Sequence, residues 1–89
     1  MPTIHLSITG KVQGVFYRAG AKKMARSMNL VGWVRNTEEG TVEAIVTGTS
    51  AQLLKFVAWC RQGPAGANVT GLDETIIDET VFESFEIVH

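Results

Sequence analysis

The stretch GWVRNTEEGTVEAIVT (residues 32–47) decides the fold, because it has the pattern of two strands joined by a tight turn. Before the turn, Val34 and Asn36 fall on one side of an extended chain, and Trp33 and Arg35 fall on the other. Residues 38–40 read Glu-Glu-Gly, which is a short polar turn. After it, apolar residues recur at every second position: Val42, Ala44 and Val46. We therefore predict a β-hairpin with strands over residues 32–37 and 40–47.

Helical patterns lie on both sides of this hairpin along the chain. Before it, apolar residues recur at i, i+3, i+4 and i+7, and Asn29 stands where the helix should end. These residues are Ala21, Met24, Ala25 and Met28. After the hairpin, Thr49 and Gln52 have the spacing of a capping box, and Gly63-Pro64 should stop the second helix. Its apolar stripe is Leu53, Phe56, Val57 and Cys60.

Strand patterns complete the order at both ends of the chain. The first segment alternates Ile4, Leu6 and Ile8 with polar residues. Residues 69–77 have strand composition with a broken period, which predicts a bulge or bend. Phe85 and Ile87 alternate with Glu86 and Val88, which predicts a short final strand over residues 85–88. The order β-α-β-β-α-β predicts an α+β, ferredoxin-like fold, with an antiparallel sheet, both helices on one face and a short extra C-terminal strand. Because this fold hosts many unrelated activities, function has to be argued from a site.

Composition limits the classes of function. The chain has 89 residues, 45% of them apolar, so we expect one domain over residues 1–89. Eight basic and nine acidic residues give a net charge of −1, which argues against nucleic-acid binding through a basic surface. Cys60 is the only cysteine and no Cys/His cluster has zinc spacing, so we expect neither disulfide nor metal. Signal-peptide and membrane-helix patterns are absent, which predicts a cytoplasmic protein with no membrane partner.

The loop GKVQGVFYR (residues 10–18) joins the first strand to the first helix. Gly10 and Gly14 allow backbone conformations in which several N–H groups converge, and the helix N-terminus favours an anion. Arg18 stands at the end of the helix where a cation is unfavourable, unless it binds an anion. The loop lacks the Lys followed by Ser or Thr that is typical of a nucleotide P-loop. From these residues alone, an anion cradle and an ordinary turn both remain open, as does a simple turn role for Asn36.

Taken together, the two segments resemble the acylphosphatase family. The family pattern is a glycine, a V-Q-G-V loop followed by two residues and an arginine, and a downstream G-W/Y-V-x-N-x-x-x-G. This chain reads GKVQGVFYR at residues 10–18 and GWVRNTEEG at residues 32–40. The likeness covers essentially the whole chain, including Gly63-Pro64 and the terminal Phe-x-Ile segment. Two departures from the family are His89 as the last residue and the small-residue run at residues 65–68.

The resemblance implies hydrolysis of the carboxyl–phosphate anhydride bond of an acyl phosphate. It makes Arg18 and Asn36 the expected catalytic residues: Arg18 clamps the phosphoryl group and Asn36 orients the attacking water. Gly10 and Thr37 are expected to support them. Loop N–H groups should bind the phosphoryl group, those of Gln13, Gly14, Val15, Phe16, Tyr17 and Arg18. No cofactor, metal or covalent intermediate is implied, because a carboxylate whose acid has a pKa of about 4 leaves without protonation.

The expected partners are a small acyl phosphate as substrate, and phosphate or sulfate as product or inhibitor, with the chain acting as a monomer. Two alternatives stay open. The first is a phosphate-binding module of the same fold without turnover. The second is an RNA-binding sheet, which the absence of aromatic residues at positions 41–46 disfavours. His5 is expected to point outward into solvent.

Overall fold

The computed structural model describes all 89 residues of the chain. Its helices and strands follow one another in the predicted order, with the short extra strand at the end. They are β1 (Thr3–Lys11), α1 (Tyr17–Ser27), β2 (Val31–Asn36), β3 (Val42–Thr47), α2 (Ser50–Gln62), β4 (Asn68–Ile77) and β5 (Phe85–Ile87). Neither helix combines the length and the hydropathy that crossing a bilayer requires.

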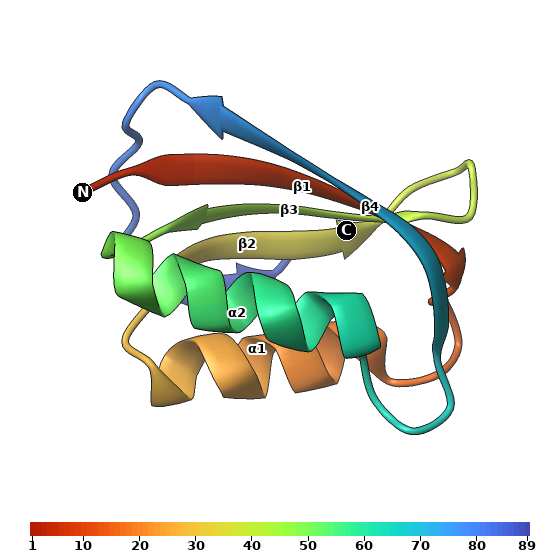
Figure 1. Cartoon of the computed structure of the whole chain (residues 1–89). Coiled ribbons are helices and arrows are strands. Elements are labelled where there is room, and N and C mark those ends of the chain that lie inside the picture. Colours follow the sequence, from red (N-terminus) through yellow and green to blue (C-terminus); the bar gives the residue numbers. More distant parts are fainter.

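The strands form one sheet in the order β4-β1-β3-β2-β5. β1 lies antiparallel between β3 and β4, and β2 lies antiparallel to β3. Both helices cover the same face of this sheet (Figure 1). The predicted ferredoxin-like arrangement is therefore confirmed. The extra strand β5 pairs with β2 in the parallel direction, so the sheet is mixed at this edge.

The core lies between the helices and the sheet. Strand alternation places the apolar residues of β1 and β3 on the helix side, where they face one another across the ladder. The register pairs Ile4 with Val46, Leu6 with Ala44 and Ile8 with Val42. The helices contribute Tyr17, Ala21, Ala25, Leu53, Phe56, Val57 and Cys60. The helical stripes predicted from the sequence are thus the buried faces, apart from Met24 and Met28 at the margin.

Local sequence signals form the structures that they predict. The Thr49 hydroxyl accepts from the N–H of Gln52 at 3.2 Å, and the Gln52 side chain accepts from the N–H of Thr49 at 3.0 Å, so the capping box is confirmed. Asn29 follows α1 in the left-handed region, with φ 58°. The hairpin strands end at Asn36 and restart at Val42, because the intervening residues form the turn.

A bulge interrupts the pairing of β1 with β4. Thr9 pairs with Gly71 while the next residue, Gly10, pairs with Val69, so Thr70 is left over on β4. This confirms the break predicted there. A Cβ atom at Gly10 would lie 2.1 Å from the Asn68 carbonyl oxygen, and φ is +120°, so the bulge needs glycine at this position. The bulge lies where the chain leaves β1 for the loop before α1.

Candidate active site

The loop before α1 holds a run of backbone N–H groups that the protein does not use. It contains two left-handed residues, Gly14 with φ 75° and Phe16 with φ 64°. None of the N–H groups from Gln13 through Ala19 donates a hydrogen bond to the protein. Phe16 is the N-cap residue of α1 and provides no side-chain cap. Because helix N-termini favour anions, this loop can bind a tetrahedral anion through its main chain.

Arg18 stands in the first turn of α1, which has no acidic residue. Its guanidinium forms no hydrogen bond or ion pair within the protein, whereas Arg26 and Arg35 each pair with a glutamate. A cation in the first turn of a helix is disfavoured by the helix dipole. An unpaired, half-buried guanidinium beside free N–H groups is suited to a dianionic phosphoryl group.

Asn36 ends β2 and carries the only buried side-chain oxygen or nitrogen without a hydrogen-bond partner, its Oδ1 atom. A buried acceptor of this kind is uncommon, since nearly all buried polar groups are hydrogen-bonded. Asn36 shares its side of β2 with Val34, which is fully buried, and β2 lies in the sheet next to β3. The amide is therefore held at the end of a rigid strand.

One cavity of about 440 Å³ joins these features. Its wall is made by the loop, by the start of α1, by Asn36 and by the end of the chain. The lining residues are Val12, Gly14, Phe16, Tyr17, Arg18, Ala19, Asn36, Ile87 and His89. The two residues predicted to be catalytic thus line the same cavity, although they are 18 positions apart. His89 lies there too, which the sequence left undecided.

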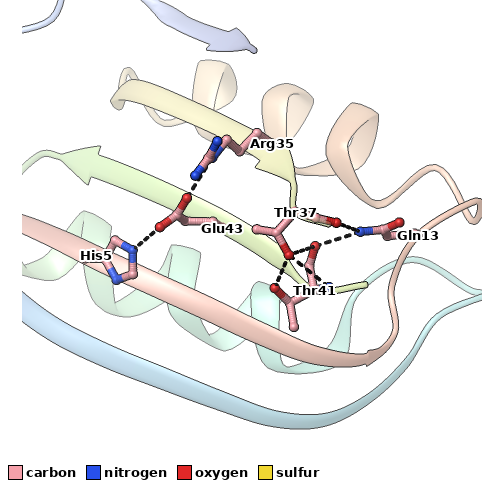
Figure 2. A network of polar contacts seen from close by, with 6 residues as sticks. All are labelled: His5, Gln13, Arg35, Thr37, Thr41 and Glu43. Carbon is pink, nitrogen blue, oxygen red and sulfur yellow. Dashed lines mark hydrogen bonds and ion pairs between the residues drawn. The ribbon is translucent and has the colours of Figure 1, made fainter. Parts of the chain in front are cut away.

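Gln13 ties the loop to the hairpin turn through its side chain. Its Nε2 atom donates to the carbonyl oxygens of Thr37 and Thr41, both at 2.9 Å (Figure 2). Sequence reasoning assigned only the N–H of Gln13 to the site and missed this bracing role. No local pattern reveals it, because the acceptors lie 24 and 28 residues away. The side chain fixes the loop relative to the turn that follows Asn36.

Gly10 and Thr37, predicted to support the site, contact other parts of the molecule. The Thr37 hydroxyl pairs with the Thr41 hydroxyl at 2.6 Å and forms no bond with the Asn36 amide. Neighbouring residues of an extended chain point to opposite faces, which separates the two side chains. Gly10 serves the bulge against β4 and does not line the cavity. Both residues therefore shape the backbone around the site, and neither forms a hydrogen bond with the side chain of Arg18 or Asn36.

The side chain of Val15 is also directed away from the cavity. It packs against the hydrophobic core, although Val15 was predicted to bind through its N–H. Tyr17 is anchored by its hydroxyl, which donates to the Cys60 carbonyl oxygen at 2.7 Å. Burial raises the pKa of the Tyr17 phenol far above its ordinary value and raises the pKa of the Cys60 thiol to about 12. Neither group supplies a nucleophile near neutral pH.

A separate polar network lies on the sheet face opposite the helices. Nε2 of His5 lies 2.6 Å from Glu43 Oε2, and Arg35 donates to Glu43 Oε1 at 2.7 Å (Figure 2). The hydrogen bond from His5, and then the bond and charge of Arg35, lower the pKa of Glu43. His5 points away from the helices, as expected, but it is only partly exposed because Glu43 on the neighbouring strand β3 pairs with it. None of the three lines the cavity.

Metal ligands do not gather anywhere in the structure: no group of three or more His, Cys, Asp or Glu side chains is arranged to hold an ion. The positive charge at the cavity comes from Arg18 and from the N–H groups of the loop and helix. What the cavity offers chemically is a main-chain anion site, one guanidinium and one carboxamide with a free acceptor.

Comparison with known proteins agrees along the whole chain. Residues 4–87 match the acylphosphatase family profile. The acylphosphatase of Methylococcus capsulatus is 47% identical over 73 residues, covering 82% of this chain and 79% of that protein. That of Syntrophus aciditrophicus is 42% identical, covering 100% and 94%. The crystal structure of acylphosphatase from Bacillus subtilis matches with a TM-score of 0.97 at 30% identity, covering 100% of both chains. This chain therefore belongs to the acylphosphatase family of acid anhydride hydrolases.

Proposed function

We propose that this chain hydrolyses the carboxyl–phosphate anhydride bond of small acyl phosphates in the cavity between the loop and Asn36. The N–H groups of residues 13–18 and the Arg18 guanidinium hold the phosphoryl group. Asn36 orients a water molecule for in-line attack on phosphorus. The reaction needs no metal and forms no covalent enzyme intermediate.

One observation carries the proposal: the unpartnered Oδ1 of Asn36 is buried beside the cavity that the unpaired Arg18 also lines. An unsatisfied buried acceptor costs about 1–3 kcal/mol of stability. A water bound between this oxygen and a phosphoryl group would satisfy the acceptor. The amide oxygen can accept a hydrogen bond from that water and so direct the water's lone pair at phosphorus, without removing a proton.

The charge balance of the cavity supports phosphoryl binding. The phosphoryl end of an acyl phosphate carries two negative charges, which the guanidinium and the main-chain N–H groups oppose. A planar guanidinium can bind two phosphate oxygens at once. The transition state of phosphoryl transfer is loose, so positioning and charge stabilisation supply most of the rate enhancement.

The reaction balances without an acid or base from the protein. The water oxygen forms a bond to phosphorus while the bond from phosphorus to the carboxylate oxygen breaks. The carboxylate leaves with the electron pair of the broken bond. Both protons of the water end on the phosphate: one stays on the attacking oxygen and the other passes to another phosphate oxygen. An acyl phosphate dianion and water thus give a carboxylate anion and dihydrogen phosphate monoanion. Because the carboxylic acid has a pKa of about 4, the leaving group needs no proton.

Two substitutions separate this function from its alternative, a phosphate-binding module without turnover. Arg18→Ala should lose phosphate affinity and hydrolysis together. Asn36→Ala should retain phosphate binding but lose turnover by about 10²–10³, as expected when a positioned polar group is removed. The assay is hydrolysis of benzoyl phosphate with excess chelator, together with phosphate binding by calorimetry. Absence of hydrolysis by the parent protein, with equal binding defects in both variants, would refute the enzymatic function.

We also propose that residues 1–89 act as one domain and as a monomer in the cytoplasm, without a nucleic-acid partner. One continuous core of 17 buried residues joins both helices to the sheet, which supports a single folding unit. The balanced net charge of −1 supports the absence of a nucleic-acid surface. Sedimentation equilibrium of the purified chain would test the monomer.

A further inference from the structure

We propose that Phe16, Ile87 and His89 form the binding site for the acyl group, and that this site favours uncharged acyl groups, aromatic ones above all. The inference rests on the proposed function, because it names the substrate class of the same cavity. It assigns a role to residues that phosphoryl chemistry does not require.

The cavity is larger than a phosphoryl group requires. The cavity has a volume of about 440 Å³. A phosphoryl group has one phosphorus and its oxygens, so it fills only a minor part of this volume. Cavities of roughly 300–1,000 Å³ typically bind whole organic ligands. The remaining space therefore lies where the acyl end of the substrate would extend.

Phe16 has an unusual backbone conformation. Its φ of 64° is left-handed, which is rare for a bulky residue and costs about 1–3 kcal/mol. Its side chain is 84% exposed, so packing in the core does not offset this strain. Phe16 nevertheless belongs to the residues that line the cavity, together with Arg18 and Asn36. An exposed aromatic ring in a strained conformation at the mouth of a cavity is well placed to contact a ligand.

The segment after β5 forms another part of the cavity wall. The N–H of Val88 donates to the carbonyl oxygen of Val34 at 2.9 Å, which fixes the segment after β5 beside β2. Ile87 and His89 flank Val88 and both line the cavity. The wall therefore offers an aliphatic side chain and an imidazole, in addition to the ring of Phe16.

The charged residues around this part of the cavity disfavour an acyl group that carries its own negative charge. Arg18 is the only Lys or Arg that lines it, and the phosphoryl group uses that charge. His89 and Asn36 also line an adjoining polar cavity, whose charged residues are Arg35, Glu38, Glu39 and Glu43. Because Arg35 pairs with Glu43, the carboxylates of Glu38 and Glu39 leave a net negative charge there. An acyl group with its own carboxylate would meet repulsion here, whereas a neutral ring would not.

The test compares three substrates: benzoyl, acetyl and succinyl phosphate. The measured quantity is the ratio of kcat/KM for benzoyl phosphate to that for acetyl phosphate, so a general effect on the phosphate loop cancels. Phe16→Asn removes the ring and keeps a residue that tolerates a left-handed backbone. We expect this ratio to fall about 3- to 10-fold, the size of one aromatic contact. Phe16→Gly, which accepts the same backbone, should lower the ratio equally.

The matched control is Val81→Asn, because Val81 is 90% exposed and does not line this cavity. It should leave the ratio unchanged. His89→Ala should lower the ratio of kcat/KM for benzoyl phosphate to that for succinyl phosphate. This decrease should be smaller than the decrease of the benzoyl-to-acetyl ratio in Phe16→Asn.

An unchanged benzoyl-to-acetyl ratio in both Phe16 variants would overturn the acyl site, as would a parent that prefers succinyl phosphate. Either result would leave the proposed function intact as long as the parent hydrolyses acyl phosphates. A parent that binds phosphate and hydrolyses none of the three would refute the proposed function, and the acyl site with it.

Discussion

Replacing Asn36 by leucine should stabilise the protein while it removes activity. Leucine has the same branched shape as asparagine but has no polar atoms, so it fills the same space. The Oδ1 atom of Asn36 is buried and has no partner in the protein. Removing an unsatisfied buried acceptor recovers its desolvation cost, about 1–3 kcal/mol. Because Asn36 is only half-buried as a residue, we expect the lower end of that range.

A gain of 1 kcal/mol corresponds to a rise of about 4–8 °C in Tm for a domain of this size. Turnover should fall by about 10²–10³, since no other group aims the attacking water. Phosphate binding should persist, because Arg18 and the loop N–H groups are untouched. Phosphate at 100 times its Kd should then stabilise both proteins by about 2.7 kcal/mol.

Thermal melts and urea titrations with and without phosphate measure the stability, and benzoyl phosphate hydrolysis measures the turnover. Asn68→Leu is the matched control, because Asn68 is exposed at the start of β4. It should change the free energy of unfolding by less than about 0.5 kcal/mol. A lower Tm for Asn36→Leu beside an unchanged control would show that the amide holds the fold together. Full turnover in Asn36→Leu would refute the role of the amide in aiming water.

Three further outcomes follow from the contacts. Gln13→Ala removes the two bonds to the hairpin turn and should lower the free energy of unfolding by about 1–3 kcal/mol and reduce kcat/KM, by urea titration and steady-state kinetics. Equal stability would contradict the bracing role. The pKa of Glu43 is lowered on folding, so its contribution to stability is present above its ordinary pKa of 4.5 and is lost as the pH falls through the lowered value. The stability difference between the parent and Glu43→Gln, followed by urea titration from about pH 6 to about pH 3, should therefore shrink with acid; a difference that grows would show the opposite sign. Gly10→Ala places a Cβ 2.1 Å from a backbone oxygen of β4 and should destabilise by more than about 3 kcal/mol, checked by melting temperature. A melting temperature equal to that of the parent would show that β4 moves away at little cost.

The sequence predicts most of the fold because the relevant signals are local. The capping box at Thr49, the turn at residues 38–40 and the broken period near Thr70 each depend on residues within a few positions of one another. Each appears in the structure, although the hairpin turn also takes in Thr37 and Thr41, which were expected in the strands. The parallel pairing of β5 with β2 is different, because the strand is only three residues long and its partner lies over 50 positions away. Its direction depends on where the chain end meets the completed sheet.

Some features of the site can also be predicted from the sequence, and others cannot. The loop pattern and the downstream Asn36 identify the family, and the two expected catalytic residues, Arg18 and Asn36, line one cavity. The roles of those residues stay predictions until the variants are measured. The bracing by Gln13, the pairing of His5 with Glu43 and the place of His89 come from contacts between distant segments, 38 residues apart for His5 and Glu43. A single sequence gives no sign of such pairs, because either partner alone reads as an ordinary polar residue.

Three unfavourable local features of this protein lie around one cavity. The bulky Phe16 has a left-handed backbone, Arg18 is unpaired at the wrong end of a helix, and Asn36 lacks a partner. Elsewhere, as at the Thr49 cap, local preference and fold agree. Natural sequences break local rules mainly where function requires it. A phosphoryl group with an attacking water would satisfy the N–H groups, the guanidinium and the amide together. The free protein is then expected to be the strained state, and the bound one the relaxed state. On this view, variants that relieve the strain without the ligand, such as Asn36→Leu, gain stability at the expense of turnover.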